Sequence, residues 1–599
     1  MNRLIANAIW LSYATTAACL APEITADTNR DGNVDQSDRV ANKGEWSAEQ
    51  GAIFLPNIGD KNMRCARRDA TGNPLSNDEL AYCSDASGHL LLAPEFAAPL
   101  RTAAMSGLSE NAVAHVYGTP RAAYERTRIF YLENAAQPNS TESWRLVDQE
   151  LSFNSSQLSA GLTLAIDGRE LVKDASVWNG TVVVKFDVTD GADHAVDSVA
   201  LKMAPILTHH HLQHVETFLT TGANGSDPIQ SEFVRQLDVA RQAAGVTKPL
   251  LLFNQSDDIW AQDFIEPAYA SMPGPQGPVA IRIMLRSAQS TRTGGRQVFE
   301  QLRGPGIGGY QPISGTGQGF GHREINSYGN LETIPPYTSR NGTRWPAGRT
   351  IMGKHFDRMP AIVPFLEAQG VQSPLILETG WMVIGHVDEF VQFLPFNNSL
   401  GFTIAIADTH SALEMLKGVQ ASGNGKTNAI SFNGTTDFPV AGVSMTVDQL
   451  MANETFITVN AYAQKYIDAN LETLLAEIPL DRAQVIRIPT LLHAAEGPGH
   501  TTDGLPSHAE VVREGEYLTG SFWPANINGV VIGKHYVTPR SWGPVVDGVD
   551  VLQKRVESAY AQAGMTISYV DDFLSHHSGF GDVHCGSNTF RQTDMAWWK

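Results

Sequence analysis

Apolar and polar residues alternate over short distances in the first part of the chain. Runs such as "GAIFLP" (51–56), "RTRIFYLE" (126–133) and "GTVVVKFDV" (180–188) are separated by Gly, Asn and Asp residues. Short alternating runs between turn-forming residues are typical of β-strands. This pattern predicts a β-sandwich over residues 22–196.

From residue 197 onward, apolar runs alternate with helical stretches. Asp227 and Pro228 suit an N-cap and a first helical residue, and the strand-like "PLLLFN" (249–254) follows that helix. The same order recurs in "GFTIAIAD" then "SALEMLKG", in a helical stretch near 454–476 then "AQVIRIP", and in "GVVIGK", "DVLQKRVESAYAQAG" and "MTISYV". Repeated strand and helix units predict an α/β domain over residues 197–599.

Length and charge narrow the class of protein. At 599 residues the chain exceeds the roughly 250–300 at which a single core stops growing, so two or more domains are expected. The formal charge of -20 argues against a nucleic-acid partner and favours a cationic one, although it also keeps a large protein soluble. No apolar stretch of about 18 residues follows the N-terminus, so no transmembrane segment is predicted.

Two features predict secretion. Residues 1–21 have one Arg, an apolar middle and small residues near the end, which resembles a signal peptide; the alternative is a poorly ordered segment in a cytoplasmic protein. Asn-x-Ser/Thr sequons, the acceptors of N-glycosylation in a secreted glycoprotein, occur at nine positions: Asn139, Asn154, Asn179, Asn224, Asn254, Asn341, Asn397, Asn433 and Asn453.

The cysteine count fits this interpretation. Of four cysteines, Cys19 lies in the expected signal peptide, Cys65 and Cys83 are close enough in sequence to form a disulfide, and Cys585 stands alone. One disulfide and one free thiol suit a secreted enzyme with a cysteine nucleophile.

A histidine and a carboxylate lie two residues apart in the apolar run "GWMVIGHVDEF" (380–390). In a strand His386 and Asp388 would project to one face, with Ile384 as an apolar wall. A buried carboxylate without a partner is costly. The extended interpretation therefore predicts a site, and the alternative is a satisfied structural pair.

Two further stretches carry unusual chemistry. In "SDDIWAQDF" Trp260 stands among Asp257, Asp258 and Asp263, which suits a bound cation; the alternative is an exposed turn with a packed Trp. In "FGDVHCGSN" Cys585 has Gly, His, Ser and Asn neighbours, which favours an exposed, activated thiol over a structural cysteine.

Together these stretches offer a thiol, a histidine and two carboxylates. A guanidinium group matches them, because its fork of N–H donors can engage two carboxylates at once. Cysteine proteases also use Cys and His, but they need one orienting partner and no paired acids.

The same stretches resemble a known family. "IWAQDFIEPAY", "SYGNLETIPP", "IGHVDEFVQFLP", "NINGVVIGKHYVTPRSWGPVVDG", "VDDFLSHHSGFGDVHCGSN" and the final "MAWWK" occur in the order found in the calcium-dependent protein-arginine deiminases. The resemblance covers about 197–599 and, more loosely, that family's middle domain. From the resemblance we expect the family's additional N-terminal domain to be missing.

The resemblance implies an α+β multidomain fold: an immunoglobulin-like, calcium-binding β-sandwich followed by a pentein five-bladed α/β propeller. It implies Cys585 as nucleophile, His386 as general acid/base, and Asp263 and Asp388 as guanidinium clamps. Trp260 would line the substrate channel. The implied reaction converts protein arginine to citrulline and ammonia through a thiouronium on the cysteine.

The sequence departs from the family where arginines grip the substrate backbone. One such position falls at Gly579, and the other is loosely matched by Arg292, so peptide preference is not predicted. The family's principal Ca2+ site falls on Gln262, Glu266, Tyr328, Leu331 and Glu332, with carbonyl oxygens from Tyr328 and Leu331. Phe264 and Arg286 replace the acids of an adjacent second site, which we expect to be lost.

The segment "DTNRDGNVDQSD" predicts a further Ca2+ site from its own spacing. Gly32 occupies position 6 of an EF-hand-like loop, and the candidate ligands are Asp27, Asn29, Asp31, Asn33, Asp35 and Asp38. The alternative is an acidic turn.

The run "THHHLQH" could ligate zinc through His209, His210, His211 and His214. It lacks an accompanying acid or thiol cluster, so we interpret it as a segment that enters the α/β domain.

The first functional hypothesis is a secreted, calcium-dependent deiminase of arginine in proteins or peptides. A deiminase of free arginine or agmatine is the second, and the calcium sites and extra β-domain argue against it. A catalytically inactive calcium-binding interaction protein is the third, and the four intact catalytic residues argue against that. The sequence predicts no oligomeric state.

Overall fold

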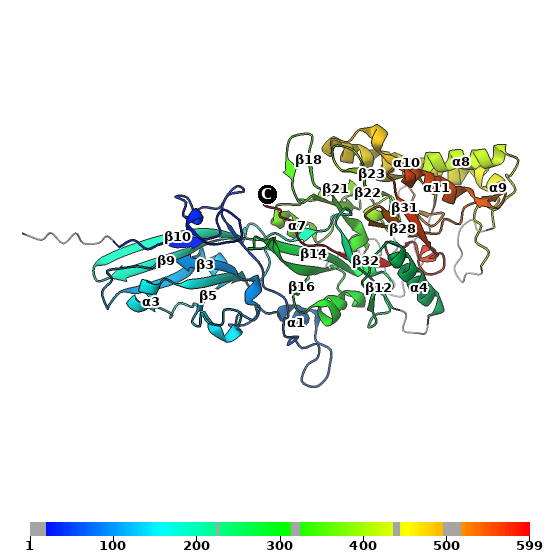
Figure 1. Cartoon of the computed structure of the whole chain (residues 1–599). Helices are drawn as coiled ribbons and strands as arrows, with labels where there is room; N and C mark the ends of the chain where they lie inside the picture. Colours follow the sequence, from blue (N-terminus) through cyan, green and yellow to red (C-terminus); the bar gives the residue numbers. More distant parts are fainter. Residues whose placement is uncertain (1–19, 223–226, 313–323, 435–443, 495–516) are drawn as a thin grey trace, which may run out of the picture.

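The computed structural model describes residues 20–222, 227–312, 324–434, 444–494 and 517–599. Most of the predicted signal peptide, including Cys19, lies outside these ranges, as does the sequon at Asn224. The molecule is elongated, with a two-sheet unit at one end and an assembly of small sheets and helices at the other (Figure 1).

The first part of the chain forms two five-stranded sheets that share one hydrophobic core. In β9 alternate residues such as Val182, Val184 and Phe186 are buried, as the apolar alternation predicts. One sheet has the order β1 (Ile24–Ala26), β3 (Ala98–Thr102), β8 (Thr163–Gly168), β5 (Thr127–Leu132) and β6 (Trp144–Leu146). The other has the order β2 (Ala52–Phe54), β10 (Asp193–Met203), β9 (Thr181–Asp190), β4 (Val113–Thr119) and β7 (Phe153–Asn154).

The second part repeats one strand-pairing pattern. Within the described residues, five small sheets each contain an antiparallel pair extended by a parallel strand. In the order antiparallel pair then parallel strand, they are β32 (Ser587–Arg591), β12 (Val215–Thr221) and β13 (Leu251–Phe253); β14 (Ile265–Met272), β15 (Val279–Arg286) and β16 (Ile307–Tyr310); β17 (Leu331–Ile334), β20 (Arg349–Lys354) and β21 (Leu375–Glu378); β22 (Val391–Pro395), β23 (Phe402–Asp408) and β24 (Ile486–Pro489); and β27 (Val530–Ile532), β28 (His535–Pro539) and β31 (Thr566–Val570).

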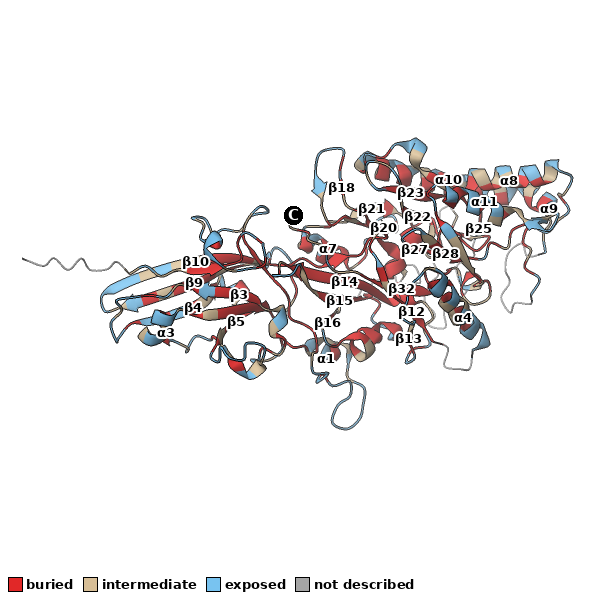
Figure 2. Ribbon diagram, viewed as in Figure 1, coloured by how far each residue is buried: buried red, intermediate tan, exposed pale blue. Residues whose placement is uncertain are grey.

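Helices follow these strands along the chain and bury one face against them (Figure 2). They include α4 (Pro228–Ala243), α7 (Val363–Gln369), α8 (Thr409–Ala421), α10 (Glu454–Glu477) and α11 (Val551–Ala561). The predicted cap of α4 is confirmed, because the Asp227 side chain accepts hydrogen bonds from the backbone N–H groups of Ile229 and Gln230. The predicted alternation of strands and helices is confirmed as well.

The first and last strands of this part pair with each other. Antiparallel β12 and β32 align Phe218 with Thr589, which brings the C-terminal segment back to the start of the α/β part. The chain end is held by Trp597, whose indole N–H donates to the carbonyl of Ser271 in β14.

The segment between β2 and β3 belongs to neither sheet. It carries α1 (Asn77–Tyr82) and a disulfide between Cys65 and Cys83. Leu80 of α1 is buried with Phe264 and Phe299 of the α/β part, so this disulfide lies outside the β-sandwich in which we expected it.

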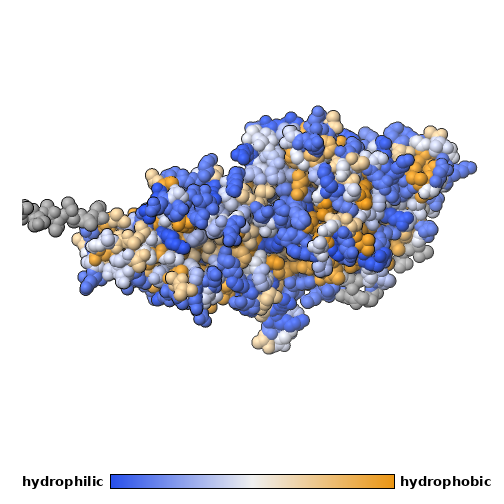
Figure 3. Space-filling view, in the orientation of Figure 1, coloured by the Kyte–Doolittle hydropathy of each residue, from blue (hydrophilic) through white to orange (hydrophobic). Residues whose placement is uncertain are grey.

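Among the described residues, no helix has both the length and the apolar character needed to cross a membrane. The face in Figure 3 is largely hydrophilic with scattered hydrophobic residues, in keeping with the net charge of -20.

Candidate active site

The site is built from short turns that precede the first strands of the small sheets. Asp263 lies in α5 (Ala261–Phe264) before β14, and Gly329 lies in the turn η6 (Tyr328–Asn330) before β17. His386 caps the turn η7 (Val387–Glu389) before β22, and Asp388 lies within that turn. Cys585 lies in the turn before β32. Residues far apart in sequence are thereby brought together.

Gly329 faces the three polar side chains of the site. A Cβ atom at Gly329 would lie 2.6 Å from His386 Nδ1, 3.1 Å from Asp263 Oδ1 and 3.1 Å from Asp388 Oδ2. Asp263 Oδ1 and His386 Nδ1 are 3.7 Å apart. These two atoms and Asp388 Oδ1 are buried without a hydrogen bond, so each of the three side chains has a polar atom left without a partner.

The extended conformation expected for residues 384–388 is wrong. Gly385 has a φ of +82°, and the Glu389 carboxylate accepts hydrogen bonds from the backbone N–H groups of Gly385 (3.0 Å) and His386 (2.7 Å). The chain therefore turns tightly, and His386 and Asp388 reach one site through a turn instead of a strand face. Ile384 is half-buried immediately before it.

The Cys585 thiol is buried, with 3% of its residue exposed, which contradicts the exposed thiol we expected. Asn528 accepts a hydrogen bond from the Cys585 backbone N–H at 3.2 Å and donates one to Sγ at 3.4 Å. Sγ lies 3.7 Å from Asp388 Oδ2. Burial, followed by the charges of Asp388 and Asp263, raises the pKa of the thiol well above its usual value.

The same surroundings set the protonation of the acid and base groups. Burial raises the pKa of Asp263 to about 6, against the opposing charges of Arg292 and His386. Burial lowers the pKa of His386, but the carboxylates of Asp263 and Asp388 outweigh it, so its pKa lies above the usual value. The neighbouring carboxyl groups therefore favour the protonated form of the imidazole.

Trp260 packs on a glycine loop next to the cysteine. A Cβ atom at Gly579 would lie 3.0 Å from the Trp260 ring, and one at Gly581 would lie 2.4 Å from it. The same Cβ at Gly581 would lie 3.1 Å from Cys585 Cβ. The glycine that stands where the family has an arginine thus leaves room for the indole.

Arg292 binds the site's own carboxylates. Its guanidinium contacts Asp258 through Nε at 2.6 Å and Nη2 at 3.1 Å, and its Nη2 lies 3.4 Å from Asp263 Oδ2. This arrangement differs from the expected contact with a substrate backbone. The acids around Trp260 were expected to bind a cation. The cation that two of them, Asp258 and Asp263, contact is the guanidinium of Arg292 in the same chain.

Three of the predicted oxygen donors of the principal Ca2+ site, those of Gln262, Glu266 and Tyr328, lie together. The Gln262 amide group donates to Glu266 Oε2 at 3.1 Å and to the Tyr328 carbonyl at 3.2 Å. Burial, followed by the charge of Glu332, raises the pKa of Glu266 well above its usual value, and Leu331 precedes Glu332 in β17. Two buried carboxylates, an amide and carbonyls fit a hard cation.

Non-acidic side chains occupy the two positions where we expect the second site to be lost. Phe264 is fully buried in an apolar cluster, and Arg286 places a cation in the core with its Nη1 bonded to Gln311.

The loop over residues 27–38 has EF-hand-like backbone features. Gly32 has a φ of +91°, and its N–H donates to Asp27 Oδ2 at 2.9 Å. Burial raises the pKa of Asp27 to about 6. The hydrogen bond from the Gly32 backbone opposes this shift, and the charge of Asp38 adds to it. The other oxygen-bearing candidates Asn29, Asp31, Asn33 and Asp35 are exposed in the same loop.

Sequence reasoning assigned no role to several residues at the site. Asn528 and Gly329 lie inside motifs that carried the resemblance, but no local pattern marks them as contacts of the thiol and the acids. His584 was noted as a neighbour of Cys585, and its Nδ1 lies 2.8 Å from Asp388 Oδ2.

Comparisons with known proteins found relatives of this chain. A family model described as protein-arginine deiminase (PAD) matches residues 193–599. Human protein-arginine deiminase type-1 is 26% identical over 602 residues, which cover 96% of this chain and 82% of that protein. Human protein-arginine deiminase type-4 is 31% identical over 353 residues, which cover 57% of this chain and 48% of that protein.

A solved C. jejuni agmatine deiminase aligns with a TM-score of 0.31 at 13% identity and covers 65% of this chain and 96% of that one, a likeness too low to support an argument. The family model, in contrast, spans more than half of the chain and includes every residue of the candidate active site. The chain belongs to the protein-arginine deiminase family.

Proposed function

We propose that the protein hydrolyses the guanidinium group of arginine residues in proteins or peptides to citrulline and ammonia, in a calcium-dependent manner. The observation that carries this proposal is the meeting of Asp263, His386 and Asp388 around Gly329, each with a buried polar atom that makes no hydrogen bond, and with the Cys585 thiol 3.7 Å from Asp388. A planar cation with several N–H donors complements that set.

Substrate binding prepares the nucleophile. The guanidinium donates to the carboxylates of Asp263 and Asp388, and its charge offsets the negative charges that raise the pKa of the Cys585 thiol. Thiolate formation is therefore favoured when substrate is bound. At Asp263 the substrate must share the carboxylate with Arg292 or displace it.

The chemical steps follow from the placement of the side chains. Cys585 Sγ bonds to the central guanidinium carbon, and the tetrahedral adduct loses ammonia, which takes a proton from His386. His386 then accepts a proton from water as the water attacks the same carbon. The carbon–sulfur bond breaks, the remaining hydroxyl proton passes to solvent as the carbonyl forms, citrulline leaves, and the thiolate returns.

Bound Ca2+ would supply positive charge at the oxygen donors of Gln262, Glu266, Tyr328, Leu331 and Glu332. Gln262 immediately precedes Asp263, so the rigidity of that segment determines where the Asp263 carboxylate lies.

We infer the finer fold assignment as well: five pseudo-repeated sheets support a five-bladed pentein propeller, and the two facing sheets support an immunoglobulin-like domain.

We propose that the protein is secreted and glycosylated. The eight sequon asparagines that the structure describes are all exposed, and Cys65 and Cys83 form a disulfide, which oxidising compartments favour. Enzymatic deglycosylation of protein secreted from a eukaryotic host should reduce its mass, and an unchanged mass would contradict glycosylation.

Rapid acid quenching tests the covalent step. During turnover of a labelled, blocked arginine amide, the peptide that contains Cys585 should gain the mass of that substrate minus ammonia. A chase with unlabelled substrate should remove the labelled adduct. A modification on another residue, or none at all under turnover, would overturn the assignment of Cys585 as nucleophile.

A further inference from the structure

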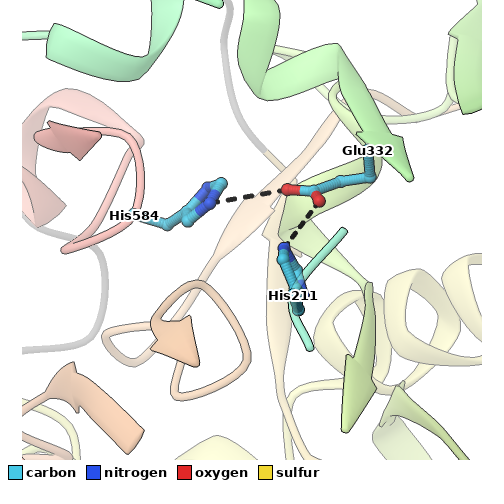
Figure 4. A group of neighbouring side chains, drawn as sticks. All are labelled: His211, Glu332 and His584. Carbon is cyan, nitrogen blue, oxygen red and sulfur yellow. Dashed lines mark ion pairs between the residues drawn. The ribbon is translucent and has the colours of Figure 1, made fainter. Parts of the chain in front are cut away.

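Two histidines and a glutamate from three distant segments meet beside the active site (Figure 4). His211 lies in the turn before β12, Glu332 lies in β17, and His584 lies in the turn before β32. His211 and Glu332 are each 5% exposed, and His584 is 9% exposed. Across the described ranges, these three side chains form the one group of at least three His, Cys, Asp or Glu residues whose ligand atoms all lie within 4.8 Å.

The two imidazoles direct their Nε2 atoms to opposite oxygens of one carboxylate. His211 Nε2 is 2.7 Å from Glu332 Oε2, and His584 Nε2 is 3.4 Å from Glu332 Oε1. Ligand atoms held about 2.1 Å from a tetrahedral zinc ion stand about 3.4 Å apart. Small shifts would therefore convert this hydrogen-bonded group into a set of metal ligands.

The surroundings of His584 suit a metal ligand. Its Nδ1 hydrogen-bonds to Asp388 Oδ2 at 2.8 Å, so Nδ1 carries the hydrogen and Nε2 keeps a lone pair in the neutral ring. Metal-binding histidines usually donate their other ring N–H to a carboxylate in this way. Asp388 would thus orient a ligand as well as a substrate.

His211 has an unused polar atom. Its Nδ1 is buried and makes no hydrogen bond, so the polar contact of this ring is the one that Nε2 makes with Glu332. A ring kept in this position for packing alone gains only one contact with Glu332. Coordination through Nε2 gives a reason for placing two imidazoles on one carboxylate.

We propose that His211, Glu332 and His584 form a binding site for a divalent transition-metal ion, with Zn2+ as the best match. Two imidazoles and a carboxylate leave a fourth position open to water, as in many zinc sites. Imidazole ligands favour ions of the zinc class, whereas Ca2+ prefers oxygen donors. This site is therefore chemically distinct from the oxygen set of Gln262, Glu266 and Tyr328.

The acid that "THHHLQH" lacks in sequence is supplied by Glu332 from another segment. The other histidines of the run do not join the group: His209 stacks on Tyr269, His210 is buried elsewhere, and His214 is exposed. Because Glu332 also belongs to the proposed Ca2+ set, the two classes of ion should compete for it, a consequence that rests on the function proposed above.

X-ray absorption of the wild-type full-length protein loaded with one equivalent of Zn2+ tests the ligands directly. We expect two imidazoles and oxygen ligands, with no sulfur. A zinc–sulfur distance of about 2.3 Å would place the ion on the thiol of Cys585 and overturn the proposal. Failure to retain Zn2+ through dialysis against metal-free buffer would overturn it equally.

Matched histidine variants locate the ion. We expect His211→Asn to weaken Zn2+ binding at least about tenfold, since even loss of an outer-shell partner typically costs 10–100-fold. His214→Asn, three residues away and outside the group, should bind as the wild type does. Equal affinity of wild type and His211→Asn, or equal losses in both variants, would overturn the site.

Two further measurements separate this site from folding and from catalysis. Melting temperatures without metal show whether His211→Asn is folded, and the absorption experiment on the wild type needs no variant. Both zinc readouts are independent of turnover, so a protein that is inactive with calcium and without zinc, yet binds Zn2+ at this site, would contradict the proposed function and leave the metal site standing.

Discussion

At the scale of single residues, Asn528 holds the reactive cysteine from two sides. Its Oδ1 accepts hydrogen bonds from the backbone N–H groups of His584 (3.1 Å) and Cys585 (3.2 Å), and its Nδ2 donates to Sγ at 3.4 Å. One amide group therefore sets both the backbone of the nucleophile and the direction of its sulfur. Asn528 is a positioning residue in this account.

We expect Asn528→Ala to lower kcat about a hundredfold, because a displacement of about 1 Å in a reacting group can have that effect. Its KM should change little, since the acids that bind the guanidinium remain. Asn526→Ala is the matched control: Asn526 is equally buried in the same turn, but its amide bonds to Pro539 and Thr538. Steady-state kinetics of both variants, with melting temperatures, check this prediction, and equal kcat values would contradict it.

At the scale of elements, the site depends on the turns that enter the small sheets. α5, η6 and η7 lead into β14, β17 and β22, the turn with Asn528 leads into β27, and the turn with Cys585 leads into β32. Each sheet thus presents one end of its first strand to a common centre. The pairing of β12 with β32 closes this arrangement, because it places the last turn next to the first segment of the α/β part.

Local patterning predicted most elements, because apolar periodicity and caps such as Asp227 act over a few residues. It failed where long-range contacts or a single glycine decide the structure. The turn at Gly385 replaced an expected strand, and Arg292 pairs with Asp258, 34 residues away. The thiol contact of Asn528 spans 57 residues, so no local pattern could reveal it.

The disulfide segment gives a prediction at the same scale. Its ends are 18 residues apart, and Arg303 of the α/β part donates hydrogen bonds to the carbonyls of Leu80 and Cys83. Closing a loop of this length contributes on the order of 3 kcal/mol. In urea unfolding, reductant should destabilise the wild type and leave a double Cys65→Ser, Cys83→Ser variant unchanged. Free thiols at both positions in unreduced peptides would contradict this prediction.

At the scale of the whole molecule, two proposed calcium regions have different relations to the active site. The loop over residues 27–38 packs against the turn between β14 and β15, since a Cβ atom at Gly32 would lie 2.2 Å from Gly274. Glu332 instead belongs to the donor set that includes Gln262, the residue before Asp263. Ions in the first region should mainly stabilise the fold, and an ion in the second should position the Asp263 carboxylate that binds the guanidinium.

We therefore expect Glu332→Ala to lose most activity at moderate calcium, because a misaimed clamp can cost roughly a hundredfold in rate. Asp31→Ala should lower the melting temperature and cost far less turnover. Activity and melting temperature across a calcium titration check both variants. Full activity of Glu332→Ala in chelator would show that the protein works without a calcium switch.

Citrulline release is the measurement that tests the whole account most directly. Wild type and Cys585→Ala are compared on a blocked arginine amide and on free arginine, each with calcium and with chelator. We expect rapid release by the wild type from the blocked amide with calcium, little from free arginine, and none by Cys585→Ala. Release from free arginine alone, or undiminished release by Cys585→Ala, would contradict it.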